Sequence, residues 1–501
     1  MDNPYNLLDA LERAVETYPE NTAFHCGNES WTYREFRDRV TRAAIGFGQL
    51  GVGAGDRVAV LSDNCHRFAE LYWVAARLGA VLVPLGTRLS EAEIGHILSE
   101  TTPTALATDN SEREDLLRGL YPAASHHIGL GEETGQGMHY EALALEERVS
   151  AEECSHALDD PVAVFYTAAT EGKPQGAVIT HRNWLTQAVQ TGARVGTGPG
   201  DVYGAFLPLY HTFEAYMSLV SLCHGATNVT MPTFDAAEAA RLISEHGITY
   251  FTEFAPMAER VMEAATRDGL DLTSLTRVVG IDFPPTIGSY LEKGVRWFTL
   301  YGQAEVAGMA LMGEFRPGDD VRENYIGRPL VLTRVSLRDA NGSPVAPGGS
   351  GEAWLRSGAV VERYWPDRPT RLTEDGWLRS GDLLQRDESG EFWFVGRTND
   401  KALIKPGGEN VYPTEVEQVL LQHPAIAQAC VFGVSDPVWK EAVRAVVVVE
   451  SGEDLAPEEV RSFCEGKISR FKWPKEVIFT EELPQAGGQV DREAVTSRFK
   501  K

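Results

Sequence analysis

Residues 162–180 read VAVFYTAATEGKPQGAVIT, an apolar run, a polar loop rich in hydroxyl groups and glycine, and a second apolar run. The two apolar runs predict β-strands. A loop between strands can turn several backbone N–H groups toward an oxyanion, so the segment is a candidate phosphate cradle. An ordinary hairpin would give the same pattern. Motifs elsewhere in the chain are needed to distinguish a phosphate-binding loop from a hairpin.

The sequence on either side of this loop alternates between apolar strands and helical patterns. Residues 58–84 predict a strand, a helix and a second strand, which is a parallel crossover unit, and similar units recur up to about residue 300. Short alternating strands separated by turn residues follow from about residue 324. We therefore predict an α/β protein, in which residues 1–396 form a large domain of parallel α/β subdomains plus a small β-barrel-like subdomain, and residues 397–501 form a small α+β domain.

Composition narrows the class of protein. The 501 residues carry 46 basic and 72 acidic side chains, a formal charge of −26, which argues against binding to nucleic acid or to anionic membranes. The six cysteines form no C-x-x-C pair, so they suggest neither a disulfide framework nor a zinc site. The first residues lack a signal-peptide pattern, and we expect a cytoplasmic protein.

The loop and four later motifs resemble the adenylate-forming ligases, a superfamily that includes acyl-CoA synthetases, luciferases and peptide-synthetase adenylation domains. Its phosphate loop is written Y-T-S-G-T-T-G-x-P-K-G. The residues that match it here include Thr167, Thr170 and Gly172; the residues that depart are Ala168, Ala169, Glu171 and Gln175. Gln175 stands where the family has a lysine and Glu171 where a hydroxyl is usual, so the resemblance implies weakened binding of the triphosphate.

Further motifs imply a nucleotide site. Residues 300–305 (LYGQAE) resemble Y-G-x-T-E, which places Tyr301, Gly302 and Gln303 beside the nucleotide and makes Glu305, together with Thr170, a ligand of Mg²⁺. The stretch ending at Asp382 and the later Arg397 resemble the family's ribose-binding pair. Residues 404–417 match the motif that opens the family's mobile C-terminal domain, and Asn399 and Asp400 fall in its hinge, near 398–401.

The acyl pocket is assigned by the same resemblance. Residues 207–211 (LPLYH) look like the family's PLFH motif, whose last side chains border the acid. Residues 280–283 (GIDF) replace the usual G-G-A-P. The implied pocket residues are Tyr210, His211, Gly280, Asp282, Phe283 and Gly308, with His211 and Glu305 also counted as catalytic. An F-D-x-S motif that would pair with an amino group is absent, which favours an acyl or aryl acid over an α-amino acid.

A further departure from the family's pattern lies near the end of the chain. Residues 483–492 resemble L-P-x-T-x-x-G-K-V-D-R, with Gln489 where the family has a lysine that neutralises charge during adenylation. The leading hypothesis is an ATP- or AMP-using, Mg²⁺-dependent ligase that forms or uses an acyl-adenylate of a small carboxylic acid, for transfer to CoA, a carrier protein or another nucleophile. The alternative is a catalytically silent relative that binds a nucleotide or acyl ligand.

Overall fold

The computed structural model describes residues 5–132, 135, 137–144, 156–167, 174–398, 402–486 and 489–500. The chain forms two compact units, which are Met1–Thr87, Leu98–Phe165 and Gly176–Gly396 in the first, and Arg88–Ile97, Tyr166–Gln175 and Arg397–Lys501 in the second. The predicted domains and hinge stay predictions, and Asn399 and Asp400 lie outside the described residues.

The first sheet contains the two strands that flank the phosphate loop. Its strands in spatial order are β21 (Arg368–Pro369), β20 (Arg363–Tyr364), β9 (Gln175–Thr180), β8 (Pro161–Thr167), β4 (Val81–Pro84), β3 (Arg57–Leu61), β5 (Ala105–Thr108), β6 (His126–Gly129) and β7 (Met138–His139). The β3 strand pairs in parallel with both β4 and β5. Helices α3 (His66–Leu78) and α4 (Glu91–Thr101) make the two crossovers, as the alternating pattern predicts.

The second sheet carries the predicted acyl pocket. Its strands in spatial order are β14 (Arg296–Phe298), β13 (Arg277–Ile281), β12 (Tyr250–Phe254), β10 (Val202–Ala205), β11 (Thr227–Thr230), β1 (Thr22–Cys26) and β2 (Glu29–Thr32). The connecting helices are α8 (Thr212–Cys223), α9 (Ala236–His246), α10 (Met257–Asp268) and α11 (Pro284–Glu292). Because β10, β12 and β13 run in parallel, their carboxyl ends meet at one edge.

The third sheet is antiparallel and carries the predicted nucleotide motifs. Its strands in spatial order are β15 (Leu300–Gln303), β16 (Gly308–Met312), β17 (Tyr325–Pro329), β23 (Phe392–Arg397), β22 (Leu378–Arg386), β19 (Ser350–Ser357) and β18 (Thr333–Arg338). A short 3-10 helix, η1 (Ala304–Val306), joins β15 to β16. This sheet is the small β subdomain that the turn-rich sequence predicts.

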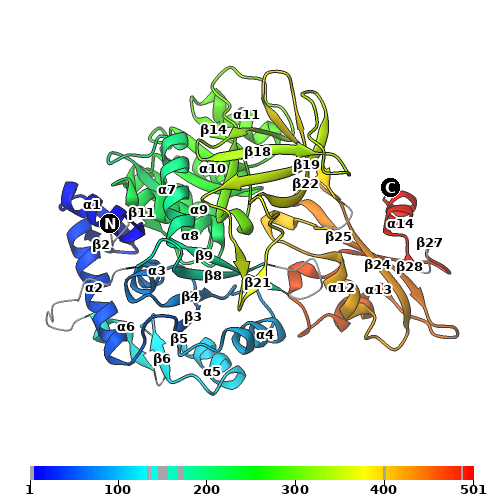
Figure 1. Ribbon diagram of the computed structural model, residues 1–501, viewed down its shortest axis with the longest axis horizontal. Helices are drawn as coiled ribbons and strands as arrows, with labels where there is room; N and C mark the ends of the chain where they lie inside the picture. Colours follow the sequence, from blue (N-terminus) through cyan, green and yellow to red (C-terminus); the bar gives the residue numbers. More distant parts are fainter. Residues whose placement is uncertain are drawn as a thin grey trace. The chain divides into compact units, whose positions relative to one another are not determined.

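The remaining helices of the first unit cover the sheets. They are α1 (Leu7–Thr17), α2 (Tyr33–Gln49), α5 (Ser111–Leu120), α6 (Tyr140–Ala144) and α7 (His181–Val195). Figure 1 shows α7 and α8 running side by side in the middle of this unit. Rings from three elements meet in its core, where Tyr72 of α3 stacks on Phe165 of β8 and meets the edge of Trp184 of α7.

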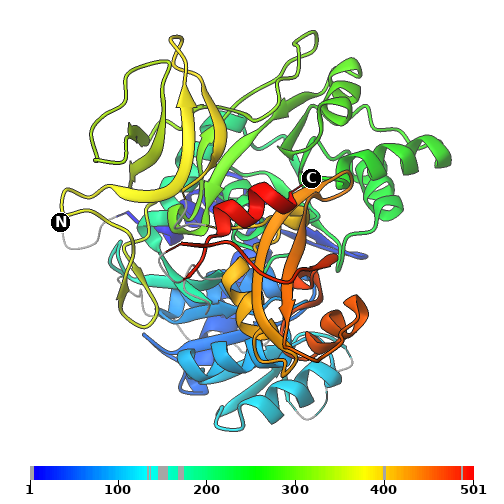
Figure 2. The same cartoon turned by 90° about the vertical axis from the view of Figure 1, so that its right-hand side faces the viewer.

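The second unit is built on its own three-stranded sheet, β24 (Ile426–Asp436), β25 (Lys440–Val449) and β26 (Glu476–Phe479). The remaining elements are η2 (Pro406–Gly408), α12 (Pro413–Leu420), α13 (Pro457–Phe463), η3 (Arg470–Lys472), β27 (Gln485–Ala486), β28 (Gln489–Val490) and α14 (Arg492–Phe499). Val431 faces the α12 and α13 side, while Phe432 faces α14. Figure 2 shows α14, in red, against the orange strands.

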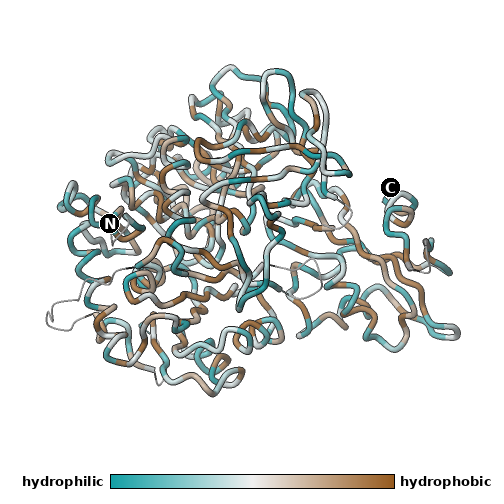
Figure 3. The backbone as a smooth tube through the Cα atoms, viewed as in Figure 1, coloured by the Kyte–Doolittle hydropathy of each residue, from teal (hydrophilic) through white to brown (hydrophobic). Residues whose placement is uncertain are grey.

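The fold class predicted from the sequence is confirmed. Figure 3 shows apolar residues concentrated along the strands of the sheets, while the exposed turns and helix surfaces are hydrophilic. Within the described residues, no helix has the length and apolar character needed to cross a bilayer.

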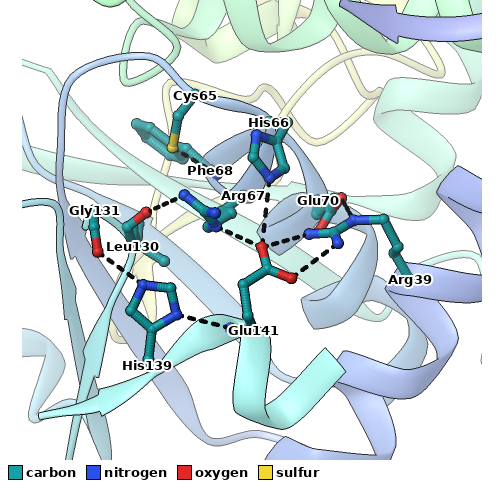
Figure 4. Close-up of polar contacts among 10 residues, drawn as sticks. All are labelled: Arg39, Cys65, His66, Arg67, Phe68, Glu70, Leu130, Gly131, His139 and Glu141. Carbon is teal, nitrogen blue, oxygen red and sulfur yellow. Dashed lines mark hydrogen bonds and ion pairs between the residues drawn. The ribbon is translucent and has the colours of Figure 1, made fainter. Parts of the chain in front are cut away.

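A partly buried ionic cluster fastens α2, α3 and α6 to one another (Figure 4). The Arg39 guanidinium of α2 donates to Glu70 of α3 over 2.6 Å and to Glu141 of α6 over 2.9 Å. The Arg67 guanidinium of α3 also donates to Glu141, over 2.6 Å, and His66 lies 3.6 Å from the same oxygen. Glu141 is therefore the point where three helices are joined.

The environment of Glu141 keeps it ionised. Burial raises the pKa of this carboxyl, but the neighbouring His66 and the hydrogen bonds from Arg39 and Arg67 outweigh burial and hold the pKa well below its usual range. A carboxyl with a lowered folded-state pKa stabilises the fold above its unfolded-state pKa, near 4.5, and loses that effect as the pH falls below it.

We predict that Glu141→Gln lowers the free energy of unfolding of the first unit by about 2–4 kcal/mol at pH 7, because two partly buried guanidinium groups lose their shared carboxylate. The difference from the wild-type protein should shrink as the pH falls from 4.5 toward 3, as followed by urea unfolding. Asp159→Asn, which removes an exposed partner of Arg182, is the control and should change stability by less than about 1 kcal/mol. Equal destabilisation by Glu141→Gln at both ends of this pH range would contradict the assignment.

Candidate functional site

Two of the predicted nucleotide-binding residues meet in the third sheet. The Tyr301 hydroxyl of β15 donates a 2.7 Å hydrogen bond to the Asp382 carboxylate of β22. Both side chains are buried, and the Asp382 backbone N–H donates to the Ser380 hydroxyl over 3.1 Å. Burial, and next the Asp382 charge, raises the pKa of Tyr301 well above its usual value, so the phenol stays protonated and remains a donor. The resemblance assigned one residue to adenine and the other to ribose, and the structure joins them.

Glu305 lies a few residues beyond this pair, in η1. The Tyr364 hydroxyl of β20 donates to its carboxylate over 2.9 Å, and the Val361 N–H donates to its backbone carbonyl over 2.9 Å. The Glu305 side chain is partly exposed. An oriented, accessible carboxylate is a suitable ligand for a Mg²⁺ ion that is otherwise held by phosphates and water. Among the described residues, no group of three or more His, Cys, Asp or Glu could hold a metal ion by itself.

The segment that carries Tyr210 and His211 is held by side chains from the first part of the chain. The Asn64 amide donates to the Leu207 carbonyl over 2.8 Å and accepts from the Leu209 N–H over 2.7 Å. The Tyr72 hydroxyl donates to the Leu209 carbonyl over 2.7 Å. These bonds satisfy buried backbone groups in a segment without regular structure, which keeps the segment in one conformation.

His211 itself caps helix α8. Its Nδ1 accepts a hydrogen bond from the Phe213 N–H over 3.3 Å, and its ring meets the Phe254 ring of β12 edge-on, with centroids 6.2 Å apart. Phe213 also meets Phe254 edge-on, at 5.4 Å. The predicted pocket histidine therefore lies in an aromatic setting at the carboxyl edge of the second sheet.

The neighbouring strand ends supply the other predicted pocket residues. Gly280 pairs with Glu253 across β13 and β12, and a Cβ at this glycine would come within 2.3 Å of the Glu253 carboxyl. Asp282 is buried, and one of its oxygens accepts from the Phe283 N–H over 2.6 Å where α11 begins. Gly280 is thus required by a close contact inside the sheet, in addition to any role toward a ligand.

Gly308 links the nucleotide and pocket regions. It pairs with Gln303 across the β15–β16 hairpin. Its φ of +146° is one that side chains rarely adopt, and a Cβ would meet the Tyr216 ring of α8 at 2.7 Å. A Cβ at Gly302 would in turn come within 2.0 Å of the Gly308 carbonyl. Both glycines are therefore required for the hairpin to close over α8.

Several predicted residues are not brought together with these. Thr170, Gly172, Asn399 and Asp400 lie outside the described residues, as do the side chains of Thr167 and Gln489. Gln175 begins β9 and is partly buried. Arg397 belongs to the second unit, where its guanidinium donates to the Leu403 carbonyl over 2.7 Å and lies 3.6 Å from Glu441. Their roles in the site stay predictions.

The residues that hold the predicted site segments carry no motif and were not predicted from the sequence. Asn64, Tyr72 and Tyr364 bond to predicted site segments, and Glu253 and Glu214 are charged side chain types buried in the second sheet and α8. One available signal was chemical: two glutamates stand in the mostly apolar segments 250–254 and 213–223. A buried acid in such a segment needs a specific partner.

A parallel α/β body that carries this Tyr–Asp pair, an accessible Glu and aromatic side chains at its strand ends, together with a small α+β unit, is the arrangement of an adenylate-forming enzyme. The chain matches the family model described as AMP-binding enzyme over residues 11–365 and the AMP-binding enzyme C-terminal domain over residues 415–487. The chain belongs to this family, and the predicted superfamily is confirmed.

Its relatives span almost the whole chain. A feruloyl-CoA synthase from Amycolatopsis sp is 30% identical over 495 residues, which cover 97% of this chain and 98% of that protein. A 2-succinylbenzoate--CoA ligase from Bacillus cereus is 29% identical, over 95% of this chain and 94% of that protein. The solved structure of an amide bond synthetase from Marinactinospora thermotolerans is 26% identical, with a TM-score of 0.86, over 98% and 100% of the two chains.

We predict that Tyr301→Phe weakens AMP binding about tenfold, measured by isothermal titration calorimetry. Loss of the phenol hydroxyl leaves the buried Asp382 carboxylate without its 2.7 Å donor, which costs about 1–3 kcal/mol and favours a different rotamer of the aspartate.

The matched control is Tyr290→Phe, because Tyr290 is an equally buried tyrosine whose hydroxyl donates to the Ala258 carbonyl over 2.9 Å. This variant should lose comparable stability and keep its AMP affinity. If both variants bind AMP as the wild-type protein does, the Tyr301–Asp382 pair is structural and does not serve the nucleotide.

Proposed function

We propose that this enzyme activates a small aryl or acyl carboxylic acid with ATP and transfers the resulting acyl group from the adenylate to CoA. The chain is an acid-activating ligase of the AMP-binding superfamily, and the proposal concerns the acid, the acceptor and the residues. The observation that carries it is the buried hydrogen bond between Tyr301 and Asp382. It supports a preformed adenosine site, because a fixed carboxylate is suited to accept hydrogen bonds from ribose hydroxyls.

The residues present fit a nucleotide and its Mg²⁺. Asp382 and Tyr301 would bind the adenosine, and Glu305, oriented by Tyr364, would bind the metal. The bound nucleotide supplies an electrophilic α-phosphorus and pyrophosphate as the leaving group. Arg397 would add a second contact to the ribose, and Thr167 and Thr170 would bind the phosphates, with Thr170 also contacting Mg²⁺.

The pocket residues favour an aromatic acid. The rings of Phe213 and Phe254 meet edge-on beside His211, and Phe283 stands at the end of the next strand. Aromatic rings add about 0.5–1.5 kcal/mol per well-oriented pair beyond the burial of their area. The two CoA ligases compared above are named for aromatic acids, ferulate and 2-succinylbenzoate. The amide bond synthetase leaves an amine as an alternative acceptor, and a carrier-protein thiol is a third.

Two neutral side chains should set the rate of adenylation. In this step a carboxylate oxygen of the acid attacks the α-phosphorus, and pyrophosphate departs; in the next, the acceptor thiol attacks the acyl carbon, and AMP departs. Gln489 and Gln175 stand where the resemblance has lysines, so the charge that develops in the first step has fewer cations beside it. We infer that adenylation is the slow step.

ATP–pyrophosphate exchange tests the proposal with a panel of cinnamic, benzoic and fatty acids, followed by a thioester assay with CoA. We expect exchange with at least one aromatic acid and formation of its CoA thioester. Exchange without a thioester would point to an amine or carrier-protein acceptor. The absence of exchange with every acid, with AMP binding retained, would refute the proposal and favour a silent nucleotide-binding relative.

We further predict that Gln489→Lys accelerates adenylation about a hundredfold, since a positioned donor at a developing charge typically contributes that much. Gln175→Lys should lower the KM for ATP. The control is Gln489→Met, which matches the length of the side chain without a charge and should not accelerate exchange. An unchanged rate in the Gln175→Lys, Gln489→Lys double variant would show that these two substitutions do not limit the reaction.

A further inference from the structure

Helix α8 carries a glutamate that is sealed from solvent next to the pocket. Glu214 is 0% exposed, although it lies in the first turn of the helix, three residues after His211. Its Oε1 lies 2.7 Å from the Tyr203 hydroxyl of β10, and its Oε2 lies 2.7 Å from the Thr252 hydroxyl of β12. The two hydroxyls are also 2.7 Å apart, which closes a ring of three contacts.

The hydrogens of this ring can be counted. Each of the three contacts needs one hydrogen, and the two hydroxyls of Tyr203 and Thr252 supply only two. An ionised Glu214 would leave one of the 2.7 Å contacts as two facing oxygen atoms with no hydrogen between them. A protonated Glu214 supplies the third hydrogen and satisfies the whole ring, so the geometry alone selects the carboxylic acid.

The electrostatic environment also favours the protonated form of Glu214. Burial raises the pKa of Glu214 to about 8, against weaker lowering by hydrogen bonds from Tyr203 and Thr252 and by the Leu207 backbone. Burial also raises the pKa values of the neighbouring phenols Tyr203, Tyr216 and Tyr250, so these phenols ionise after Glu214.

The other elements that pack on α8 bring no counter-charge to Glu214. β11 and β16 contain no titratable residue. On α7, Arg182 and Arg194 pair with Asp159 and Glu314, and His181 stacks on His156. Arg13 of α1 bonds to the Cys223 carbonyl, at the opposite end of α8.

The ring bridges the two elements between which His211 lies. Glu214 connects the first turn of α8 to Thr252 of β12, and two residues further along β12 Phe254 meets the His211 ring. Thr252 and Phe254 point to the same face of their strand. The separation between α8 and β12 that the ring fixes is therefore the separation that holds the histidine against the phenylalanine.

We propose that Glu214, as a hydrogen-bonded carboxylic acid, is a positioning residue that fixes His211 and the segment 207–211 in the acyl pocket. Glu214 does not touch the substrate. Its ionisation leaves one contact of the ring without a hydrogen, loosens the first turn of α8 and weakens recognition of the acid. The effect of Glu214 on recognition of the acid rests on the proposed function. Its positioning of residues 207–211 does not.

Hydrogen exchange measured by mass spectrometry tests the positioning role without any substrate. At pH 7, Glu214→Ala should accelerate exchange in peptides covering residues 207–213 about tenfold, because two buried hydroxyls lose their partner. Glu214→Gln keeps an acceptor and a donor and should stay within about threefold of the wild-type protein.

The matched control is Tyr33→Phe. The Tyr33 hydroxyl is also buried against α8, but it donates to the Leu222 and Ala226 carbonyls at the far end of the helix, over 3.1 and 2.7 Å. It should leave exchange in residues 207–213 unchanged. Equal acceleration by Glu214→Ala and Tyr33→Phe would overturn the proposal, whatever the enzyme activates.

A pH profile then separates positioning from a structural role. With whichever cinnamic or benzoic acid supports exchange, the wild-type KM for the acid should rise several-fold between pH 7 and 9, while the KM for ATP stays constant. Glu214→Gln, which cannot ionise, should show a flat KM for the acid over this range. A rise of equal size in the Gln variant would assign the titration to another group and refute the role of Glu214.

Discussion

The hydrogen bond between Tyr301 and Asp382 is the contact on which the arrangement of the site depends. It joins Tyr301 of β15 to Asp382 of β22, 81 residues apart in the sequence, and both side chains are buried. A buried carboxylate without a donor is unfavourable, so the Tyr301 hydroxyl helps to fix the direction of the Asp382 carboxylate. Glu305 follows in the same hairpin and is directed by Tyr364. The predicted nucleotide-binding pair is therefore part of the third sheet, and its hydrogen bond needs no ligand to form.

Much of this could be predicted from the sequence, for identifiable physical reasons. Alternation between strand and helix periods gave the parallel sheets, and the turn-rich stretch after residue 324 gave the antiparallel sheet. Residues in contiguous motifs, such as Tyr301 to Glu305, were found because their spacing is local. The partners that hold them were not found, because Asn64 bonds to Leu207 and Leu209 across more than 140 residues. The local hydrophobic pattern carries no information about such a long-range contact. A single asparagine in a loop would be expected to face solvent.

The protein accommodates buried carboxyl groups in three different ways, which matters for a chain with a net charge of −26. Glu141 is kept ionised by two guanidinium groups. Asp382 accepts from a neutral phenol. Glu214 has neutral hydrogen-bonding partners, among them the Tyr203 and Thr252 hydroxyls, and favours its proton. Burial raises the pKa of both Glu141 and Glu214, and their different hydrogen-bonding partners decide the protonation state of each. For this reason, the number of acidic residues in the sequence does not reveal how many charges the first unit buries.

Helix α8 contacts the β15–β16 hairpin as well as the predicted acyl pocket. The Tyr216 ring of α8 occupies the space that a side chain at position 308 would need. His211, at the start of the same helix, borders the predicted acid site. A substitution that shifts α8 to admit a bulkier acid would press this ring against the hairpin that holds Glu305. Substitutions at Asp282 and Phe283, which follow strand β13, are therefore better suited to changing substrate specificity than substitutions in helix α8. Laboratory evolution toward new acids should accumulate its tolerated changes on that side of the pocket.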